Sequence, residues 1–292
     1  MQIIPSVNDM QAVALKARHA GKRISLVPTM GFLHEGHLSL VRKARDLSDF
    51  LVVSIFVNPT QFGPHEGFDS YPRDMQRDHH VCRNENVDVV FCPSSDEIYA
   101  DDHSVTIEET QLSAGLCGGS RPGHFRGVIT IVAKLFNIIH PHIAVLGQKD
   151  AQQSRVIEKM VRDLNFPIEI ITLPTVREPD GLAMSSRNSC LSKQERERAT
   201  CIYKSLCLAQ RLYTEQIKDA DVISNRMREL IMRNQPSPVP VDIDYIEIRD
   251  DRTLKPIDRI KDSTLIAVAV RIGNTRLIDN VILGGSHSPH NA

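Results

Sequence analysis

Two histidines three residues apart give the strongest chemical signal in this chain. His34 and His37 lie in the stretch Pro28-Thr-Met-Gly-Phe-Leu-His-Glu-Gly-His-Leu38. An apolar pair precedes it, and apolar residues at helical spacing follow, which predicts a strand, a loop and a helix with both imidazoles on one face of its first turn. The free N–H groups of such a turn suit a phosphate, and two imidazoles can donate to a triphosphate. The alternative is a pair of ordinary surface histidines.

A second polar pair follows the next apolar run. Residues 50–57 are almost continuously apolar, which predicts a strand covered on both faces, as in a parallel sheet. Asn58 and Gln61 come directly after it, where open α/β sheets bind their ligands. Turn formation explains Asn58, which precedes a proline, but explains Gln61 less well. Both interpretations stay open from the residues alone.

A lysine and an aspartate follow another predicted strand, residues 143–146. Lys149 could reach phosphate oxygens and Asp150 could accept a hydrogen bond from a ribose hydroxyl. The simpler alternative, an aspartate near the start of a helix, explains Asp150 only.

Two hydroxyls and a guanidinium stand together further on, at Ser185, Ser186 and Arg187. On a loop they would form a mobile clamp for an anion. The alternative is a helix-capping loop, but Ser192 and Glu195 already form a capping box for the next helix. The glycine-rich, basic stretch 116–126 is compatible with either a surface loop or close approach of a ligand.

The elements that would carry these residues alternate between strand and helix. Strands are expected at 24–27, 50–57, 87–92, 143–146 and 167–173, which predicts a doubly wound α/β sheet. After about residue 175 we expect two helices, near 193–214 and 219–233, and strands at 241–248, 265–270 and 272–278. The prediction is therefore a Rossmann-like parallel sheet in residues 1–175 and a smaller α+β domain in residues 176–292. The last eight residues are expected to be a disordered tail.

Composition excludes several classes of protein. The 292 residues are 41% hydrophobic and 24% charged, as in a globular protein, and the net charge of −1 argues against an extended nucleic-acid surface. No apolar run is long enough to span a membrane. The six cysteines lack metal-site spacing, and no secretion signal is apparent, so we expect free thiols in the cytoplasm. Neither a dinucleotide-binding glycine fingerprint nor a P-loop is present.

Taken in order, these motifs resemble the pantothenate synthetase family, whose members are also called pantoate–β-alanine ligases. The resemblance covers nearly the whole chain and rests on Pro28–Leu38, Phe56–Pro64, Tyr71–Arg73, Arg121–Phe125, Lys134–Asn137, Gly147–Gln153, Leu182–Asn188, Ala267–Gly273 and Asp279–Asn280. It implies a Rossmann-like nucleotidyltransferase fold with a C-terminal lid. The implied reaction joins (R)-pantoate to β-alanine with ATP, through a pantoyl-adenylate, and releases AMP and pyrophosphate. The family is typically a cytoplasmic homodimer that uses Mg²⁺.

The resemblance also implies residue roles. The catalytic residues would be His37, the proton donor, with His34 and Lys149. Gln61 would contact pantoate and β-alanine, and Gln153 would contact pantoate. The Mg²⁺ ligands are not apparent; Asp78 is either an indirect contact of the metal or a plain helix residue. ATP would be bound by Met30, Gly31, Phe32, Leu33, His34, Glu35, Gly36, His37, Gly147, Gln148, Lys149, Asp150, Val176, Met184, Ser185, Ser186 and Arg187. Gln148 and Ala151 depart from the glutamate and the aromatic residue expected there.

Two other functions are weighed against this one. Another adenylyltransferase of the same superfamily, acting on a nicotinamide or pantetheine phosphate, would share the histidine helix but not Asn58–Pro64 with Gln153. An RNA-binding module derived from an aminoacyl-tRNA synthetase would need a basic surface, which the near-neutral charge disfavours.

Overall fold

The structure is a computed structural model that describes residues 1–64, 66–233 and 239–284. The predicted tail and two of the prolines before the third-last strand, Pro236 and Pro238, lie outside the described residues. Contacts divide the chain into two compact units. Unit 1 contains residues 1–113, 121–148 and 153–176, and unit 2 contains residues 114–120, 149–152 and 177–292.

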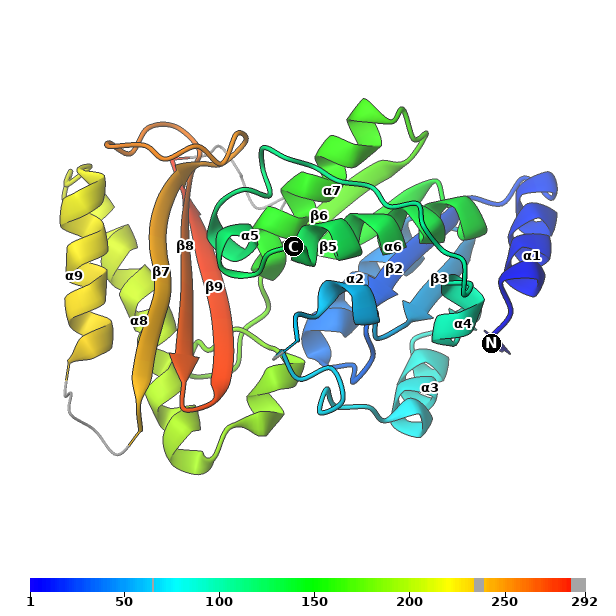
Figure 1. Cartoon of the computed structure of the whole chain (residues 1–292), viewed down its shortest axis with the longest axis horizontal. Helices are drawn as coiled ribbons and strands as arrows, with labels where there is room; N and C mark the ends of the chain where they lie inside the picture. Colours follow the sequence, from blue (N-terminus) through cyan, green and yellow to red (C-terminus); the bar gives the residue numbers. More distant parts are fainter. Residues whose placement is uncertain (65, 234–238, 285–292) are drawn as a thin grey trace. The chain divides into compact units, whose positions relative to one another are not determined.

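Unit 1 is built on a six-stranded parallel sheet in the order β1-β4-β3-β2-β5-β6 (Figure 1). After β2 the chain passes to β3 and β4 on one side, and it later returns to β5 on the other. The order therefore reverses between β2 and β5, and such a reversal is where open α/β sheets bind ligands. The strands are β1 (Gln2–Ile4), β2 (Ile24–Thr29), β3 (Phe50–Ile55), β4 (Val89–Phe91), β5 (Ile143–Gly147) and β6 (Glu169–Leu173).

Both faces of this sheet are buried, which explains the continuous apolar runs. Val27, Val53 and Val145 pack in one core cluster with residues of α2. Leu26 and Val52 immediately precede two of these valines, so they point to the opposite face, and both are fully buried. Helices α1 and α6 pack together and against β2. The helices of unit 1 are α1 (Val7–His19), α2 (Glu35–Asp46), η1 (Pro59–Gln61), α3 (Met75–Asn84), α4 (Ser95–Ile98), α6 (His124–Ile139) and most of α7 (Ala151–Asp163).

Unit 2 contains a three-stranded antiparallel sheet, with β8 between β7 and β9. Helix α8 packs against β8 and β9, and α9 packs against β7 and α8 (Figure 1). Their apolar residues form one core cluster that includes Ile202, Ile223 and Val268. The elements are α5 (Leu116–Ser120), η3 (Ser186–Cys190), α8 (Lys193–Thr214), α9 (Ala220–Met232), β7 (Val241–Asp250), β8 (Thr264–Ile272) and β9 (Thr275–Leu283).

The predicted fold class is confirmed, and local signals explain most boundaries. Ser6 caps α1, and the Ser192–Glu195 capping box begins α8 as predicted. Several details differ from expectation; for example, residues 116–120 form a short helix, β1 adds an edge strand, and residues 148–150 form a 3₁₀ turn, η2. No described helix is long and apolar enough to cross a membrane. The division of function between residues 1–175 and 176–292 stays a prediction.

Candidate active site

The predicted histidine pair lies at the beginning of α2, at the carboxyl end of β2. His34 is the N-cap residue rather than part of the first turn, and its extended backbone leads into the helix at Glu35. The backbone N–H of His34 donates to Nδ1 of His37 over 3.3 Å. The two ring centroids are 4.0 Å apart. Both imidazoles therefore lie together at the helix N-terminus, where the unpaired N–H groups and helix dipole favour an anion.

A buried carboxylate fixes the loop that precedes this helix. Asp78 of α3 is 1% exposed, and its oxygens accept hydrogen bonds from the backbone N–H groups of Phe32 (2.7 Å) and Leu33 (2.8 Å). Gly31 and Phe32 both have positive φ, and a Cβ at Gly31 would lie 2.9 Å from Ile55 and 3.0 Å from Asp78. Only glycine therefore lets the loop pass this close.

Opposing effects act on the ionisation of this carboxylate. Burial raises the pKa of Asp78, whereas the hydrogen bonds from Leu33 and Phe32 and the charge of Arg77 act to lower the pKa. Bonds to charged acceptors are shorter and stronger than neutral ones, and both are short here. Asp78 therefore holds the backbone of the loop in one conformation.

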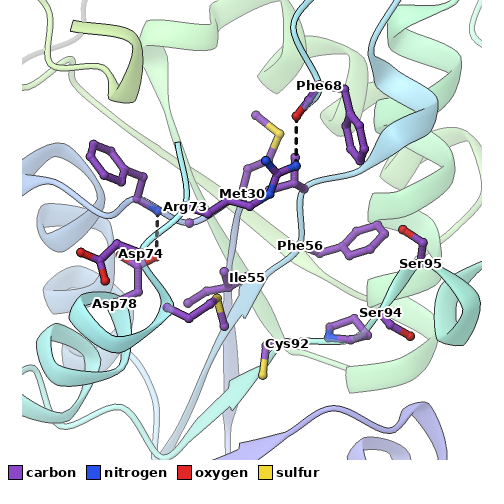
Figure 2. A pocket seen from close by; sticks show the side chains of 15 residues that line it. Met30, Ile55, Phe56, Phe68, Arg73, Asp74, Asp78, Cys92, Ser94 and Ser95 are labelled. Carbon is purple, nitrogen blue, oxygen red and sulfur yellow. Dashed lines mark hydrogen bonds between the residues drawn. The ribbon is translucent and has the colours of Figure 1, made fainter. Parts of the chain in front are cut away.

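A cavity of about 250 Å³ adjoins this anchor. In Figure 2, Asp74 and Asp78 lie on one side of it, and Phe56, Ser94 and Ser95 lie on the other. Arg73 is turned to a backbone carbonyl, that of Phe68, at 3.0 Å (Figure 2). The lining residues are Met30, Gly31, Phe32, Ile55, Phe56, Val57, Phe68, Arg73, Asp74, Met75, Asp78, Cys92, Pro93, Ser94 and Ser95.

Gln61 lies at the end of the 3₁₀ helix that follows β3, and it is 9% exposed. Its side-chain oxygen accepts a hydrogen bond from the Asn58 amide at 3.2 Å, and its amide nitrogen lies 3.0 Å from the sulfur of Met30. Asn58 Oδ1 in turn accepts from the Tyr99 hydroxyl at 2.8 Å. Unit 1 thus brings two predicted site residues, Met30 and Gln61, into contact.

Lys149 belongs to unit 2, where β9 holds its backbone. The side-chain amide of Asn280 donates to the Lys149 carbonyl oxygen at 3.0 Å, and the Asn280 N–H donates to Asp279 at 2.8 Å. Asp279 also receives two hydrogen bonds from Arg177, at 2.6 and 3.0 Å. Burial raises the pKa of Asp279, against the lowering effect of Arg177. The Asp279–Asn280 pair therefore ties both Lys149 and the start of the 177–190 segment to one strand.

The predicted anion clamp lies in η3 rather than in an irregular loop. Ser185 is its N-cap residue, and its hydroxyl accepts a hydrogen bond from the Arg187 N–H at 3.3 Å. The Asn188 amide donates to Glu178 at 2.8 Å. Ser185 therefore already serves one purpose, as a cap. Its proposed contact with a phosphate would have to use the hydroxyl hydrogen.

The predicted site residues divide between the two units. Unit 1 contains Met30, Gly31, Phe32, Leu33, His34, Glu35, Gly36, His37, Gln61, Gly147, Gln148, Gln153 and Val176, and unit 2 contains Lys149, Asp150, Met184, Ser185, Ser186 and Arg187. Within unit 1, Gly147 ends β5, which pairs with β2, so it lies at the same edge of the sheet as the loop 30–34. A Cβ at Gly147 would lie 3.9 Å from Leu40 of α2.

The resemblance was tested by comparison with known proteins. A sequence profile described as "Pantoate-beta-alanine ligase" matches residues 2–282. The chain belongs to the pantoate–β-alanine ligase family. A pantothenate synthetase from Thermotoga petrophila is 55% identical over 97% of this chain and 100% of that protein. The chain is therefore an enzyme of this ligase family, which decides against both alternatives weighed from the sequence.

Two solved structures of pantoate–β-alanine ligases agree with this fold. One from Thermus thermophilus is 40% identical, with a TM-score of 0.90 over 96% of this chain and 99% of that chain. One from Francisella tularensis, described as complexed with "Beta-gamma ATP and Beta-alanine", is 34% identical, with a TM-score of 0.80 over 97% of both chains.

The structure shows a supporting role, not predicted from the sequence, for Asp78 and Asn280. Asp78 holds the histidine loop and Asn280 holds Lys149, but both belong to elements far away in the sequence. No spacing signal connects residues 46 or 131 positions apart, so sequence reasoning had no means to pair them. Asn58 was singled out as polar, and its contact with Gln61 gives it a supporting role.

Proposed function

We propose that this enzyme activates pantoate by adenylation at the beginning of α2. The pantoate carboxylate attacks the α-phosphorus of ATP in line, and pyrophosphate leaves. Both reactants are anionic, so the site must neutralise charge as the pyrophosphate departs. The observation that supports this is the His34–His37 pair at a helix N-terminus whose loop is fixed by Asp78. His37 would act as the proton donor to the leaving phosphate.

The family resemblance adds further residues to the proposed phosphate contacts. Lys149 and Arg187 would contact phosphate oxygens, and Ser185 and Ser186 would donate hydrogen bonds. A guanidinium suits this task because it offers several fixed donors to a phosphate. Among the other predicted ATP-binding residues, Met30 to Leu33 belong to the loop that Asp78 fixes through the N–H groups of Phe32 and Leu33, and Asp150 would accept from the ribose.

In the second step, the β-alanine amine attacks the acyl carbon of pantoyl-adenylate, and AMP leaves. The mixed anhydride is already activated, so positioning dominates this step. Gln61 and Gln153 would hold the pantoate, and Gln61 would also contact β-alanine. The 177–190 segment would exclude water, which otherwise hydrolyses the adenylate.

Magnesium enters this proposal only as part of the nucleotide substrate. Among the described residues, no group of three or more His, Cys, Asp or Glu side chains is placed to hold a metal ion. The Asp78 oxygens are bound to backbone N–H groups. The described residues therefore identify no protein-held Mg²⁺ site, and no step is assigned to one. Mg²⁺ commonly binds substrate phosphates with few protein ligands. A cytoplasmic homodimer stays a prediction.

The decisive experiment measures AMP release from ATP in three mixtures: with pantoate alone, with β-alanine alone, and with both acids. We expect sustained AMP release only with both acids, and one equivalent of pyrophosphate per site with pantoate alone. Sustained release with β-alanine alone would refute the order of the two steps.

Variants test the residue roles in the same assay. His37→Ala and Lys149→Ala should slow adenylation by about 10²-fold, as for loss of one preorganised donor. Preformed pantoyl-adenylate should restore pantothenate formation in both variants. Unchanged single-turnover adenylation in either variant would remove that residue from the mechanism.

A further inference from the structure

A largely buried ion pair, Arg121 with Glu66, lies next to the backbone of Gln61 in unit 1. The Arg121 guanidinium donates to both carboxylate oxygens of Glu66, each at 2.6 Å. The two side chains are 11% and 25% exposed. Burial alone would raise the pKa of Glu66, but the hydrogen bonds and charge of Arg121 outweigh it and lower the pKa to about 2. The pair is therefore charged at neutral pH, and its fork geometry fixes the guanidinium plane.

The same guanidinium fixes the protonation of a neighbouring histidine. Nδ1 of His124 lies 2.8 Å from the backbone carbonyl oxygen of Gln61, which can only accept, so Nδ1 carries the proton. Nε2 of His124 lies 2.9 Å from Arg121, which can only donate, so Nε2 must be the acceptor. These two contacts fit a neutral His124 with its proton on Nδ1.

Arg121 and His124, which we call the clamp of Gln61, contact the same atom. The carbonyl oxygen of Gln61 accepts from His124 and, at 3.3 Å, from Arg121. One turn further along, α6 packs on the backbone of η1 so closely that a Cβ at Gly127 would lie 2.4 Å from the Thr60 oxygen and 2.7 Å from the Gln61 nitrogen. The backbone of Gln61 is therefore held at its carbonyl oxygen by two side chains and at its nitrogen by close packing on α6, and the Asn58 amide fixes the end of its side chain.

We propose that Arg121 and His124 are positioning residues that fix the Gln61 backbone and thereby set the enzyme's affinity for its two small carboxylic acid substrates. The proposal rests on the proposed role of Gln61 as a ligand of those acids. It assigns the Arg121–Pro–Gly–His124 motif to the acyl side of the reaction and not to ATP. Glu66 takes part by holding Arg121 in the orientation that His124 requires.

A conservative substitution separates this role from general support of the fold. In His124→Asn, the amide nitrogen occupies nearly the position of Nδ1 and can still donate to the Gln61 carbonyl, whereas His124→Ala has no donor. We expect His124→Ala to raise the KM for pantoate and for β-alanine ~10-fold, the loss of about one hydrogen bond to a buried acceptor. The KM for ATP should stay within about twofold, and His124→Asn should recover most of the loss.

Arg121→Lys provides the second variant, in case His124→Ala fails to fold. Lysine keeps the charge but cannot hold Glu66, His124 and Gln61 at once, so the KM for both acids should rise by ~10-fold with the KM for ATP unchanged. Arg126→Ala is the matched control, because it removes an exposed arginine two residues further along α6. It should change none of the three KM values. Thermal melting establishes that each variant is folded before kinetics are compared.

The double variant with Gln61→Ala shows whether the clamp acts through Gln61. If it does, His124→Ala should add little to the effect of Gln61→Ala on the two acid KM values. If the effects of His124→Ala and Gln61→Ala on the acid KM values add, the clamp is wrong. It is also wrong if His124→Ala raises the KM for ATP as much as the KM values for the acids, or if His124→Asn and His124→Ala have equal kinetics.

Failure of the clamp and failure of the proposed function give different results. If Gln61→Ala raises the acid KM values but His124→Ala and Arg121→Lys do not, the clamp is wrong and Gln61 keeps its role. If Gln61→Ala leaves both acid KM values unchanged, the proposed role of Gln61 is wrong, and the clamp falls with it.

Discussion

Two segments that carry predicted phosphate contacts, one in each unit, are held in different ways. The loop before α2 in unit 1 is held by the Asp78 carboxylate, which binds two backbone N–H groups. The segment before α8 in unit 2 is held through side chains: Arg196 pairs with Glu178 at 2.5 Å and Asp180 at 2.7 Å, and Arg177 pairs with Asp279. The first segment has its backbone atoms fixed directly, and the second is attached by charged side chains.

This difference has physical consequences. A buried carboxylate on backbone N–H groups is shielded from salt and leaves the loop little freedom. The Arg196 pairs are partly exposed, with 25% to 44% of each side chain accessible. Salt therefore screens them, and the entropy lost on ordering the side chains reduces the stability that they contribute. The buried Arg177–Asp279 pair is the exception, and it stands at the beginning of the segment. We therefore expect the histidine loop to be rigid, and the 177–190 segment to be firmly anchored only at its start.

The largest loss of stability is expected at the Arg177–Asp279 pair. Arg177→Ala leaves the Asp279 carboxylate, 1% exposed, without its partner, and should cost about 4 kcal/mol in the free energy of unfolding. Urea denaturation at pH 7 measures it. Loss of Arg177 also raises the pKa of Asp279 further, so the cost should be smaller at pH 5, where the acid is more readily protonated. A cost under about 1 kcal/mol would mean that the pair does not anchor the segment.

The next largest loss of stability should come from Asp78, which holds the backbone of the loop before His34. Asp78→Ala leaves two N–H groups without acceptors in a buried site and should cost about 3 kcal/mol of stability. Adenylation should slow as well, because the loop before His34 loses its fixed conformation. Stopped-flow adenylation and urea denaturation test the two effects separately. Asp74→Ala, which removes only the N-cap of α3, is the control and should cost about 1 kcal/mol with adenylation preserved. Equal adenylation rates in both variants would contradict a role for Asp78 in shaping the loop.

The Glu66–Arg121 pair in unit 1 allows a pH test of how burial strengthens an ion pair. The pKa of Glu66 is about 2 when folded, below its ordinary value of 4.5, so its stabilisation is present above pH 4.5 and is lost as pH falls towards 2. Allowing for partial exposure, the stability difference between wild type and Glu66→Gln should shrink by about 2 kcal/mol over that interval. Denaturant titrations at pH 2.5, 3.5 and 5 measure it. A difference that does not change with pH would contradict the prediction.

The smallest effect should come from the exposed pairs of unit 2. Arg196→Ala should cost no more than about 1 kcal/mol, and less at high salt. The Arg196 bond lowers the pKa of Asp180, so this small stabilisation is present above the ordinary pKa and is lost as pH falls. Urea denaturation at two salt concentrations tests it. A large, salt-independent loss would show that the two segments are held equally firmly and would remove the contrast between them.

Much of the fold could be predicted because its signals are local. The apolar run ending at Val57 predicted a strand buried on both faces, and Ser192 with Glu195 predicted the beginning of α8; the structure confirms both. The predicted roles of the site residues follow from the family resemblance and stay predictions. The 116–120 helix was not predicted, because its glycines favour a turn. Its N-terminal region is held by Gln152, which accepts from the Cys117 N–H at 2.9 Å and donates to the Gly115 carbonyl at 2.8 Å.

The sequence by itself determined the order of most strands and helices and the family, and it supplied the candidate site residues as predictions. These depend on periodicity, capping and short motifs, which act over a few residues. Only the tertiary structure decided which distant groups hold those residues: Asp78 on the histidine loop, Asn280 on Lys149, and Arg121 with His124 on Gln61. Each is a hydrogen bond between elements far apart in the chain, and its partners are chosen by the packing of the whole unit.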